Sequence, residues 1–404
     1  MEKKYNWIWF KRYSNMNFTS IDHVENEEFS VVWDLGRRCT YACSYCGPHH
    51  SNKTSPMVNI DELKCTIDGI FEYSNLLNQY RTKPKNLNIA YTGGEPTIHP
   101  AFFDFVRYTK NKYPFITSNI TTNGCFSQTK CKEIIECVTN ATISYHTEAT
   151  EKEKQIVRNN IKFMSDVGYN FRVNLMFHKD YFDECIIIAD WLDEMGIKYT
   201  PRPIGDSGNK QDILDGTAHV YTKEQLSWFS NYWKKGKKTE IKSKTKNEEL
   251  ATKKIGRTCC NGKCLNVKID NKFFKQTYVP STNFQSWNCM INWDFLFINS
   301  ELNGVWHHQT CQVNLDGHIG PIGKASEFEN IIRNLKKKLS SGKMAVIKCP
   351  KTFCGCGLCS PKALQENDAK KIFESRTKYL EPVFQKKVKD ISKDETIYGR
   401  FTEL

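Results

Sequence analysis

The sequence lacks any apolar run long enough to cross a membrane, and its first residues lack the apolar core of a secretion signal. A membrane-spanning helix needs about 20 predominantly apolar residues, whereas the chain begins Met-Glu-Lys-Lys-Tyr-Asn-Trp-Ile-Trp-Phe. A signal peptide has an extended apolar region of its own. We therefore expect a cytoplasmic protein without a membrane partner. Its 404 residues suffice for two or three domains, each with its own core.

Acidic residues are scarce relative to basic ones: 45 Asp and Glu stand against 58 Lys and Arg, a net charge of +13. Much of the excess lies in one basic run, Lys234 to Arg257. Such a run is typical of a solvated linker. A nucleic-acid footprint needs its cations on one folded face, with aromatic side chains for stacking. We therefore do not expect nucleic acid as a partner.

Cysteine is abundant, with 17 residues. Without a secretion signal this count indicates metal ligands or catalysis rather than disulfides. Three cysteines lie between Cys39 and Cys46, and nine lie between Cys259 and Cys359. The other five are Cys65, Cys125, Cys131, Cys137 and Cys185, for which small hydrophobic residues are the simplest interpretation.

Cys39, Cys43 and Cys46 form a C-x₃-C-x₂-C loop just after an apolar run. Iron–sulfur clusters take Cys thiolates, and three thiolates hold three of the four irons of a [4Fe–4S] cube. The fourth iron is left without a nearby protein ligand. An open metal position is a place where a substrate or cosubstrate binds, so the spacing indicates catalysis.

Residues 28 to 204 alternate strand-like and helix-like segments. The expected strands are Phe29–Asp34, Leu87–Thr92, Phe115–Thr121, Ala141–His146, Phe171–Phe177 and Lys198–Pro203. The expected helices are Ile60–Tyr80, Ala101–Lys112, Thr129–Cys137, Glu151–Val167 and Phe182–Met195. Short apolar strands separated by helices indicate a parallel sheet, and six β/α repeats predict a partial (β/α)₆ TIM-type barrel rather than a closed one of eight. The Cys39 loop follows the first strand, at the edge where such sheets form their sites.

The residues after the β/α repeats have a different sequence pattern. Cysteine, glycine and asparagine in short segments of poor periodicity predict a small domain organised by metal rather than by a large core. We expect an N-terminal extension (1–27), the partial barrel (28–215), a helical and basic connector (216–258), the cysteine-rich domain (259–361) and a charged terminal helix and tail (362–404).

The segment Gly93-Gly94-Glu95-Pro96 ends the second expected strand. Two glycines allow close approach to the backbone, and Glu95 offers an acceptor for an ammonium group. Alone this turn is a weak signal, but one strand beyond the Cys39 loop it is a strong one.

These two motifs, with Tyr45 just before Cys46, resemble the signature of the radical S-adenosylmethionine (SAM) superfamily over roughly residues 28 to 204. The resemblance implies that SAM chelates the open iron and that the reduced cluster cleaves SAM. The 5′-deoxyadenosyl radical so formed would abstract a substrate hydrogen. The resemblance also implies an electron donor such as flavodoxin or ferredoxin.

The resemblance further implies which residues contact SAM. Gly93, Gly94 and Glu95 would hold the methionine amino group, and Tyr45 would lie near the adenine. Asn123 lies in a segment similar to one near SAM in relatives, and Ser144 matches a position that often contacts the ribose or the methionine part. For these polar residues a strand-end turn or cap is the alternative.

Five further polar residues are second-rank candidates, as ligands of the substrate or of the SAM carboxylate or as structural pairs. We expect all of them to point towards the same mouth. They are His146, Glu148, Arg172, Asn174 and Arg202.

The second cysteine group comprises Cys259, Cys260, Cys264, Cys289, Cys311, Cys349, Cys354, Cys356 and Cys359. Zinc is one candidate, because Cys₄ zinc sites use short spacings; iron–sulfur is the other, favoured by the radical SAM resemblance. The stretch Cys289 to Cys359 resembles the SPASM/twitch auxiliary-cluster domains, although its last group, C-x₄-C-x-C-x₂-C, departs from their usual spacing. We expect two auxiliary clusters or one, with a spare thiol among the adjacent Cys259 and Cys260.

The sequence favours radical modification of a peptide or protein side chain, since domains resembling SPASM often serve peptide modification. Modification of a small molecule, such as a sugar, nucleoside or amino acid, is the first alternative. A nucleic-acid base modifier that grips phosphates with the basic run is the second. An iron–sulfur electron carrier or sensor is disfavoured by the glycine-rich turn and the open cluster.

Overall fold

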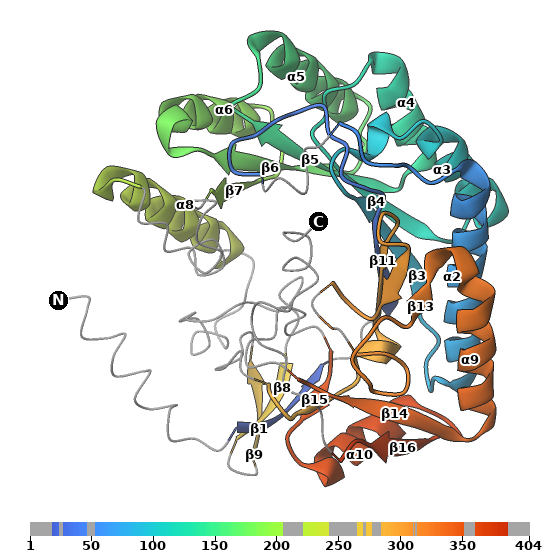
Figure 1. Cartoon of the computed structure of the whole chain (residues 1–404). Coiled ribbons are helices and arrows are strands. Elements are labelled where there is room, and N and C mark those ends of the chain that lie inside the picture. Colours follow the sequence, from blue (N-terminus) through green and yellow to red (C-terminus); the bar gives the residue numbers. More distant parts are fainter. Residues whose placement is uncertain are drawn as a thin grey trace. The chain divides into compact units, whose positions relative to one another are not determined.

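The fold is described from a computed structural model of the whole chain. The structure describes residues 18–23, 27–46, 53–204, 221–241, 265–269, 272–276, 284–309, 311, 313–350 and 360–386. The chain divides into two compact units, which are described separately (Figure 1). The first unit comprises Met1–Val32, Cys65–Leu87 and Ala251–Leu404, and the second comprises Trp33–Lys64 and Asn88–Leu250. The five segments expected from the sequence remain a prediction.

The second unit contains the sheet strands β3-β4-β5-β6-β7, and β2, most of which belongs to the first unit, is next to β3 in the strand order. These strands are β2 (Glu28–Asp34), β3 (Asn86–Thr92), β4 (Thr117–Thr122), β5 (Asn140–His146), β6 (Phe171–Phe177) and β7 (Tyr199–Pro203). Strands β3 to β7 pair in parallel. Helix α2 (Ile60–Tyr80) lies mostly in the first unit, and the helices of the second unit include α3 (Phe102–Lys112), α4 (Gln128–Cys137), α5 (Glu151–Asp166) and α6 (Phe182–Glu194). The α/β fold class is confirmed, and β7 ends the strand order, so among the described strands the sheet is open.

The two faces of this sheet differ in polarity. Buried and accessible residues alternate along β3, β5 and β6, as expected for a period of two. The buried set is apolar and includes Ile89, Ile143 and Val173. Helices α3 to α6 lie along one side of the sheet (Figure 1). Burial of this apolar face holds the strands and their carboxyl-end loops in place.

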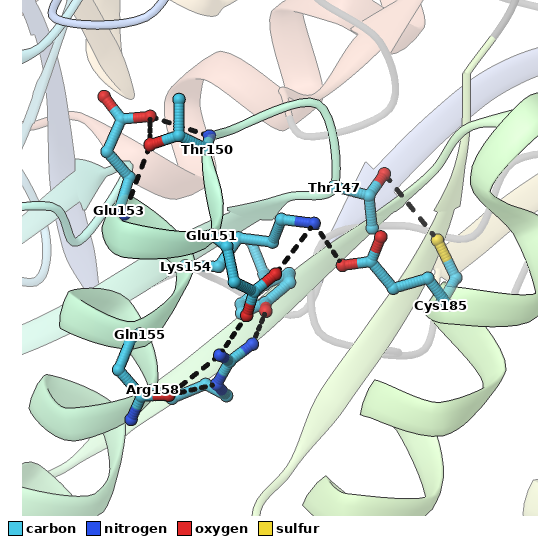
Figure 2. A network of polar contacts seen from close by, with 10 residues as sticks. Thr147, Thr150, Glu151, Glu153, Lys154, Gln155, Arg158 and Cys185 are labelled. Atoms are coloured by element: carbon cyan, nitrogen blue, oxygen red, sulfur yellow. Dashed lines mark hydrogen bonds and ion pairs between the residues drawn. The ribbon is translucent and has the colours of Figure 1, made fainter.

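A polar network holds α5 at the carboxyl end of β5 (Figure 2). Thr150 and Glu153 form a capping box, in which each side chain accepts the other's backbone N–H. Lys154 contacts the carboxylates of Glu151 and Glu184, which links α5 to α6. The loop that begins at His146 is therefore fixed on its outer side.

Helix α8 (Lys223–Ile241) begins in the segment where the sequence predicts a helix, Thr222–Trp233. Thr222 caps it, with Gln225 N–H donating to the threonine hydroxyl at 3.3 Å. Phe229 packs edge-on against Phe177 of β6, at 5.1 Å between ring centroids. The start of the expected connector is thus part of the second unit, whereas residues 242–258 lie outside the described residues.

The first unit contains a seven-stranded sheet in the order β16-β14-β10-β15-β1-β8-β9. These strands are β1 (Phe18–His23), β8 (Leu265–Ile269), β9 (Lys272–Gln276), β10 (Asn288–Cys289), β14 (Lys343–Lys348), β15 (Lys362–Ala363) and β16 (Glu381–Phe384). The antiparallel strands β11 (Phe295–Asn299), β12 (Gly304–Trp306) and β13 (Gly323–Lys324) belong instead to the other sheet, where β11 is next to β2. The structure thus assigns part of the expected N-terminal extension to a strand.

Helix α9 (Phe328–Ser340) corrects the expectation that residues 259–361 lack periodicity and a core. Its buried residues are Phe328, Ile331, Ile332, Leu335 and Leu339, an i, i+3, i+4, i+7 pattern. Helix α10 (Glu366–Arg376) confirms the expected terminal helix. Among the described helices of both units, none is long and apolar enough to cross a membrane.

Candidate active site

The Cys39 loop lies between β2 and α2 and is held by backbone hydrogen bonds. Leu35 N–H donates to the carbonyl of Thr92 at 2.9 Å, so the loop starts beside the end of β3. The Arg38 Nε donates to the carbonyl of Ser55 at 2.5 Å. Cys46 N–H donates to the Cys43 carbonyl at 3.1 Å, which makes a tight turn between the last two thiols.

The three thiols are half-buried, and burial is the main reason that their pKa values are high. It raises the pKa of Cys39, that of Cys43 to about 12 and that of Cys46 to about 11. A hydrogen bond from Tyr45 partly opposes the shift of Cys43. The bare loop therefore carries protonated thiols at neutral pH, and thiolates need a bound cation to form.

Among the described residues, no group of three or more His, Cys, Asp or Glu side chains surrounds a single point as a mononuclear metal site does. A cube does not require this, because each thiolate binds a different iron. Three half-buried thiols on one loop are a donor set that fits a cluster with one iron left open.

Gly93 and Gly94 join the end of β3 to the Cys39 loop. Gly94 N–H donates to the Gly36 carbonyl and Glu95 N–H to the Arg38 carbonyl, each at 2.7 Å. A Cβ on Gly94 would lie 2.3 Å from the Arg38 carbonyl oxygen, and Gly93 has a φ of +139°. Glycine is required because the loop backbone fills the side-chain positions. The glycines were expected to admit a ligand; on this side they admit the protein's own chain.

The Glu95 carboxylate is buried and connects three strand-end segments. Its Oε1 accepts from Thr97 N–H at 3.1 Å and from the hydroxyls of Thr97 and Thr122, each at 2.7 Å. Its Oε2 accepts from Asn123 N–H at 2.7 Å. Burial raises the pKa of Glu95, and these hydrogen bonds oppose the rise. The expected partner was an ammonium; the partners observed are four protein donors, which give Glu95 a positioning role.

Asn123 extends this connection to the first thiol. Its Nδ2 donates to the Thr40 hydroxyl at 2.8 Å and lies 3.9 Å from the Cys39 sulfur. Its Oδ1 accepts from Cys125 N–H at 2.9 Å. Glu95 and Asn123 therefore link the ends of β3 and β4 to Cys39. Thr97 and Thr122 were missed by the sequence analysis, although polar residues at strand ends were the signal.

His146 and Glu148, which the sequence indicated as second-rank candidates, contact the middle of the loop at Cys43, Ser44 and Tyr45. His146 Nδ1 lies 3.4 Å from the Cys43 sulfur and hydrogen-bonds to the Tyr45 hydroxyl. The Tyr45 ring stacks on the imidazole at 6.0 Å and 10°. Glu148 accepts from Ser44 N–H at 2.9 Å and from its hydroxyl at 2.6 Å. The carboxyl end of β5 therefore fixes the middle of the loop.

The remaining sheet candidates do not all reach one mouth, which corrects the expectation. Ser144 lies on β5 opposite Asn174 of β6, two residues before His146. Arg202 is level with the carboxyl end of β6, opposite Met176. Arg172 lies at the other end of β6, opposite Thr142. The parallel register therefore separates Arg172 from the thiol loop along the strand.

Only part of the second cysteine group falls within the described residues, and this part lies in the first unit. Cys289 of β10 and Cys311 belong to one buried apolar cluster. Cys349 N–H donates to the Trp287 carbonyl at 2.8 Å, so Cys349 and Cys289 lie on the same side of the β10–β14 pair. The structure brings these three thiols into one region. The other six, Cys259, Cys260, Cys264, Cys354, Cys356 and Cys359, lie outside the described residues.

Of the scattered cysteines, Cys131 and Cys185 are fully buried, as expected of small hydrophobic residues. Cys125 and Cys137 are half-buried, and Cys65 is exposed. For Cys65 the expectation is wrong, because it lies on the solvent side of α2.

Comparison with known proteins gives one sequence similarity and several structural ones. No protein-family model matches the chain. The chain is 24% identical over 213 residues to a GTP 3′,8-cyclase from Campylobacter fetus subsp. fetus, an alignment of 48% of this chain and 64% of that relative. The chain thus spans less than two thirds of this curated relative.

Two solved structures illustrate the structural likeness. One is native anSMEcpe with bound AdoMet and the Kp18Cys peptide, at 12% identity and a TM-score of 0.43, covering 86% of this chain and 96% of that one. The other is Streptococcus suis SuiB bound to the precursor peptide SuiA, at 12% identity and a TM-score of 0.37, covering 58% of this chain and 50% of that one.

The C-x₃-C-x₂-C loop, the Gly93–Pro96 turn hydrogen-bonded to it and the sequence similarity all support the resemblance of the chain to the radical SAM superfamily.

Proposed function

We propose that the protein is a radical SAM enzyme whose active site is the Cys39 loop. The observation that carries the proposal is the link from Glu95 through Asn123 to Cys39, which joins the ends of β3 and β4 to the thiols. Cys39, Cys43 and Cys46 would hold a [4Fe–4S] cluster. When reduced, such a cluster supplies the electron that splits SAM into methionine and a 5′-deoxyadenosyl radical, which takes a hydrogen atom from the substrate.

The chain's own residues have separate tasks in this proposal. Glu95 and Asn123 hold the Cys39 end of the loop, and His146 with Glu148 holds its middle at Cys43 and Ser44. These two sets of contacts would keep the thiols in place before the cluster enters. The proposed SAM contacts remain the backbone of Gly93, Gly94 and Glu95 and the side chains of Tyr45, Asn123 and Ser144.

The electron would come from a small reduced protein such as flavodoxin or ferredoxin, in the cytoplasm. We further propose one or two auxiliary iron–sulfur clusters, held by thiols of the second cysteine group. Cys289, Cys311 and Cys349 support this, because they lie in one region of the first unit. We propose no nucleic-acid or membrane partner.

For the substrate we propose a peptide or protein side chain, on the basis of the resemblance of residues 289–359 to SPASM/twitch domains. A small molecule is the second candidate, favoured by the sequence similarity to an enzyme named for its action on GTP. A nucleic-acid base is the third. Mass analysis of the products from each kind of candidate would separate them.

The test of the chemistry is release of 5′-deoxyadenosine. Protein reconstituted without oxygen and given dithionite and SAM is expected to release it, and C39A is expected not to. The matched control is C65A, which removes an exposed thiol on α2. Equal release by C39A and wild type would contradict the proposal. Iron content should be about twelve per chain for three cubes and about four for one.

A further inference from the structure

Lys362 of β15 is buried inside the first unit, with 1% of the residue exposed. A lysine is almost never fully buried unless its charge is balanced, because an ammonium that leaves water loses its hydration. The ammonium of Lys362 lies over the ring of Phe284, 4.6 Å from the ring centroid. Such a cation–π contact offsets only part of the cost of desolvation. The other groups on this face of the sheet therefore bear on what balances the charge.

The strand register places Lys362 beside a thiol. Strand β15 pairs antiparallel with β10, and Lys362 is opposite Cys289. Residues opposite each other in an antiparallel pair point to the same face, with Cβ atoms about 4.5–5.5 Å apart. On the other side of β10, Cys289 is opposite Ile347 of β14, and these two side chains pack in one buried cluster. Ile347, Cys289 and Lys362 are therefore level on one face of three adjacent strands.

A second thiol lies on the same face. Cys349 N–H donates to the Trp287 carbonyl at 2.8 Å, two positions along the strands from Cys289. Side chains two positions apart on a strand share a face. The Trp287 ring is edge-on to Phe284, with ring centroids 5.1 Å apart. The ring that holds the Lys362 ammonium thus packs against the strand position that pairs with Cys349.

The connection from β14 to β15 is rich in cysteine. It carries four members of the second cysteine group, namely Cys349, Cys354, Cys356 and Cys359. The last three lie outside the described residues. In sequence, Lys362 follows the last of these thiols by three positions. The lysine and four thiols therefore belong to one short stretch of chain.

These thiols and this cation are a set that fits an iron–sulfur cluster. Thiolates are the ligands of such clusters, and their negative charge contributes to the net charge that sets the reduction potential. A buried negative group is stable only when cations or hydrogen bonds balance it. Because reduction makes a cluster more negative, a cation beside it stabilises the reduced state and raises the potential.

We propose that the Lys362 ammonium balances the charge of an auxiliary iron–sulfur cluster bound at Cys289 and Cys349, and that it raises the reduction potential of this cluster. The inference rests on the auxiliary clusters proposed above. Lys362 acts through the cluster and has no contact with substrate in this role. The Cys39 loop belongs to the second unit and is not involved.

The experiment measures the reduction potential of the auxiliary clusters in the full-length chain. A C39A/C43A/C46A background removes the loop thiols, so that only clusters of the second cysteine group give a signal. The reconstituted protein is titrated with dithionite without oxygen, and the reduced cluster is followed by electron paramagnetic resonance.

K362M removes the charge and keeps an apolar side chain of similar length. It should make reduction of one auxiliary cluster at least about tenfold less favourable, which for one electron is a potential lower by about 59 mV. K362R keeps the charge and should retain most of the potential of the background protein. The matched control is K343M, which removes an exposed lysine of β14 and should leave the potential unchanged.

Urea unfolding of the iron-free proteins is a second measurement. Without a cluster, the ammonium of Lys362 lacks the anion that the proposal assigns to it, so iron-free K362M should be at least as stable as the background protein. A large loss of stability in iron-free K362M would mean that an acidic residue of the protein balances the charge. That result would overturn the proposal.

The outcomes separate this inference from the proposed function. A background protein that binds no iron contradicts the auxiliary clusters, and the role of Lys362 falls with them. Iron-loaded K362M with the same potential as K343M overturns the role of Lys362 alone. Iron uptake by K362R but not by K362M would show that the cluster needs the charge, which supports the proposal.

Discussion

His146 Nδ1 lies 3.4 Å from the sulfur of Cys43, although 103 residues separate them in sequence. The same nitrogen hydrogen-bonds to the Tyr45 hydroxyl. Burial lowers the pKa of His146 to about 4, so the ring is neutral at physiological pH. The end of β5 thereby orients two residues of the thiol loop, and the loop's conformation depends on the sheet.

The apoprotein should lose stability in alkaline solution as its loop thiols ionise. Burial raises the pKa of Cys43 to about 12 and that of Cys46 to about 11, above the ordinary value of 9.0. The unfolded chain therefore releases these protons first, so their contribution is complete below about pH 9 and is lost as the pH rises through 11 to 12. Urea unfolding at a series of pH values measures this. A C43A/C46A variant should show a flatter alkaline slope, and an equal slope would contradict the assignment.

G94A should prevent the Cys39 loop from closing onto β3. The new Cβ would lie 2.3 Å from the Arg38 carbonyl oxygen, a backbone atom that cannot rotate away. We expect a loss of about 1–3 kcal/mol in the free energy of unfolding and little iron uptake. The control is G196A, where φ is +67° but no atom lies within 4 Å. It should cost about 1–2 kcal/mol with normal iron uptake; iron uptake by G94A at the wild-type level would be the contrary result.

E95Q should destabilise the loop because it removes a hydrogen-bond acceptor, since the Gln and Glu side chains are nearly equal in size. Four donors converge on the Glu95 carboxylate, and an amide nitrogen cannot accept from any of them. A buried unsatisfied donor costs about 1–3 kcal/mol. The control E151Q alters an exposed ion pair with Arg158, which is screened by solvent, so little loss is expected. Denaturant unfolding compares the two, and equal losses would contradict the role given to Glu95.

The repeating part of the fold was predictable because its signals are local. Apolar strands, helix starts such as Thr150 with Glu153, and helix-ending glycines each occur within a few residues. The thiol loop and the Gly93–Pro96 turn were equally visible. The fold of the first unit was less predictable, because β1 pairs with β8 and β15, which lie hundreds of residues away in the chain. Sequence periodicity carries no information on such pairings.

The contacts within the site also join residues that are distant in sequence, so they could be predicted only in part. The sequence predicted that His146 and Glu148 lie near the mouth. It did not predict that they contact Cys43 and Ser44. It placed Arg172 at the mouth, whereas the register puts it at the far end of β6. The expected strand Phe171–Phe177 has the bounds of β6, so the strand was predicted correctly and only the position of Arg172 along it, near the amino end, was misjudged.

The bonds from Gly94 to Gly36 and from Glu95 to Arg38 have a consequence for biogenesis. They form only when β2 and β3 are paired in the correct register, since a slip of one residue would turn every side chain to the opposite face. A misfolded chain would therefore present its three thiols in the wrong places. Metal loading would then act as quality control, because only correctly folded chains would receive a cluster.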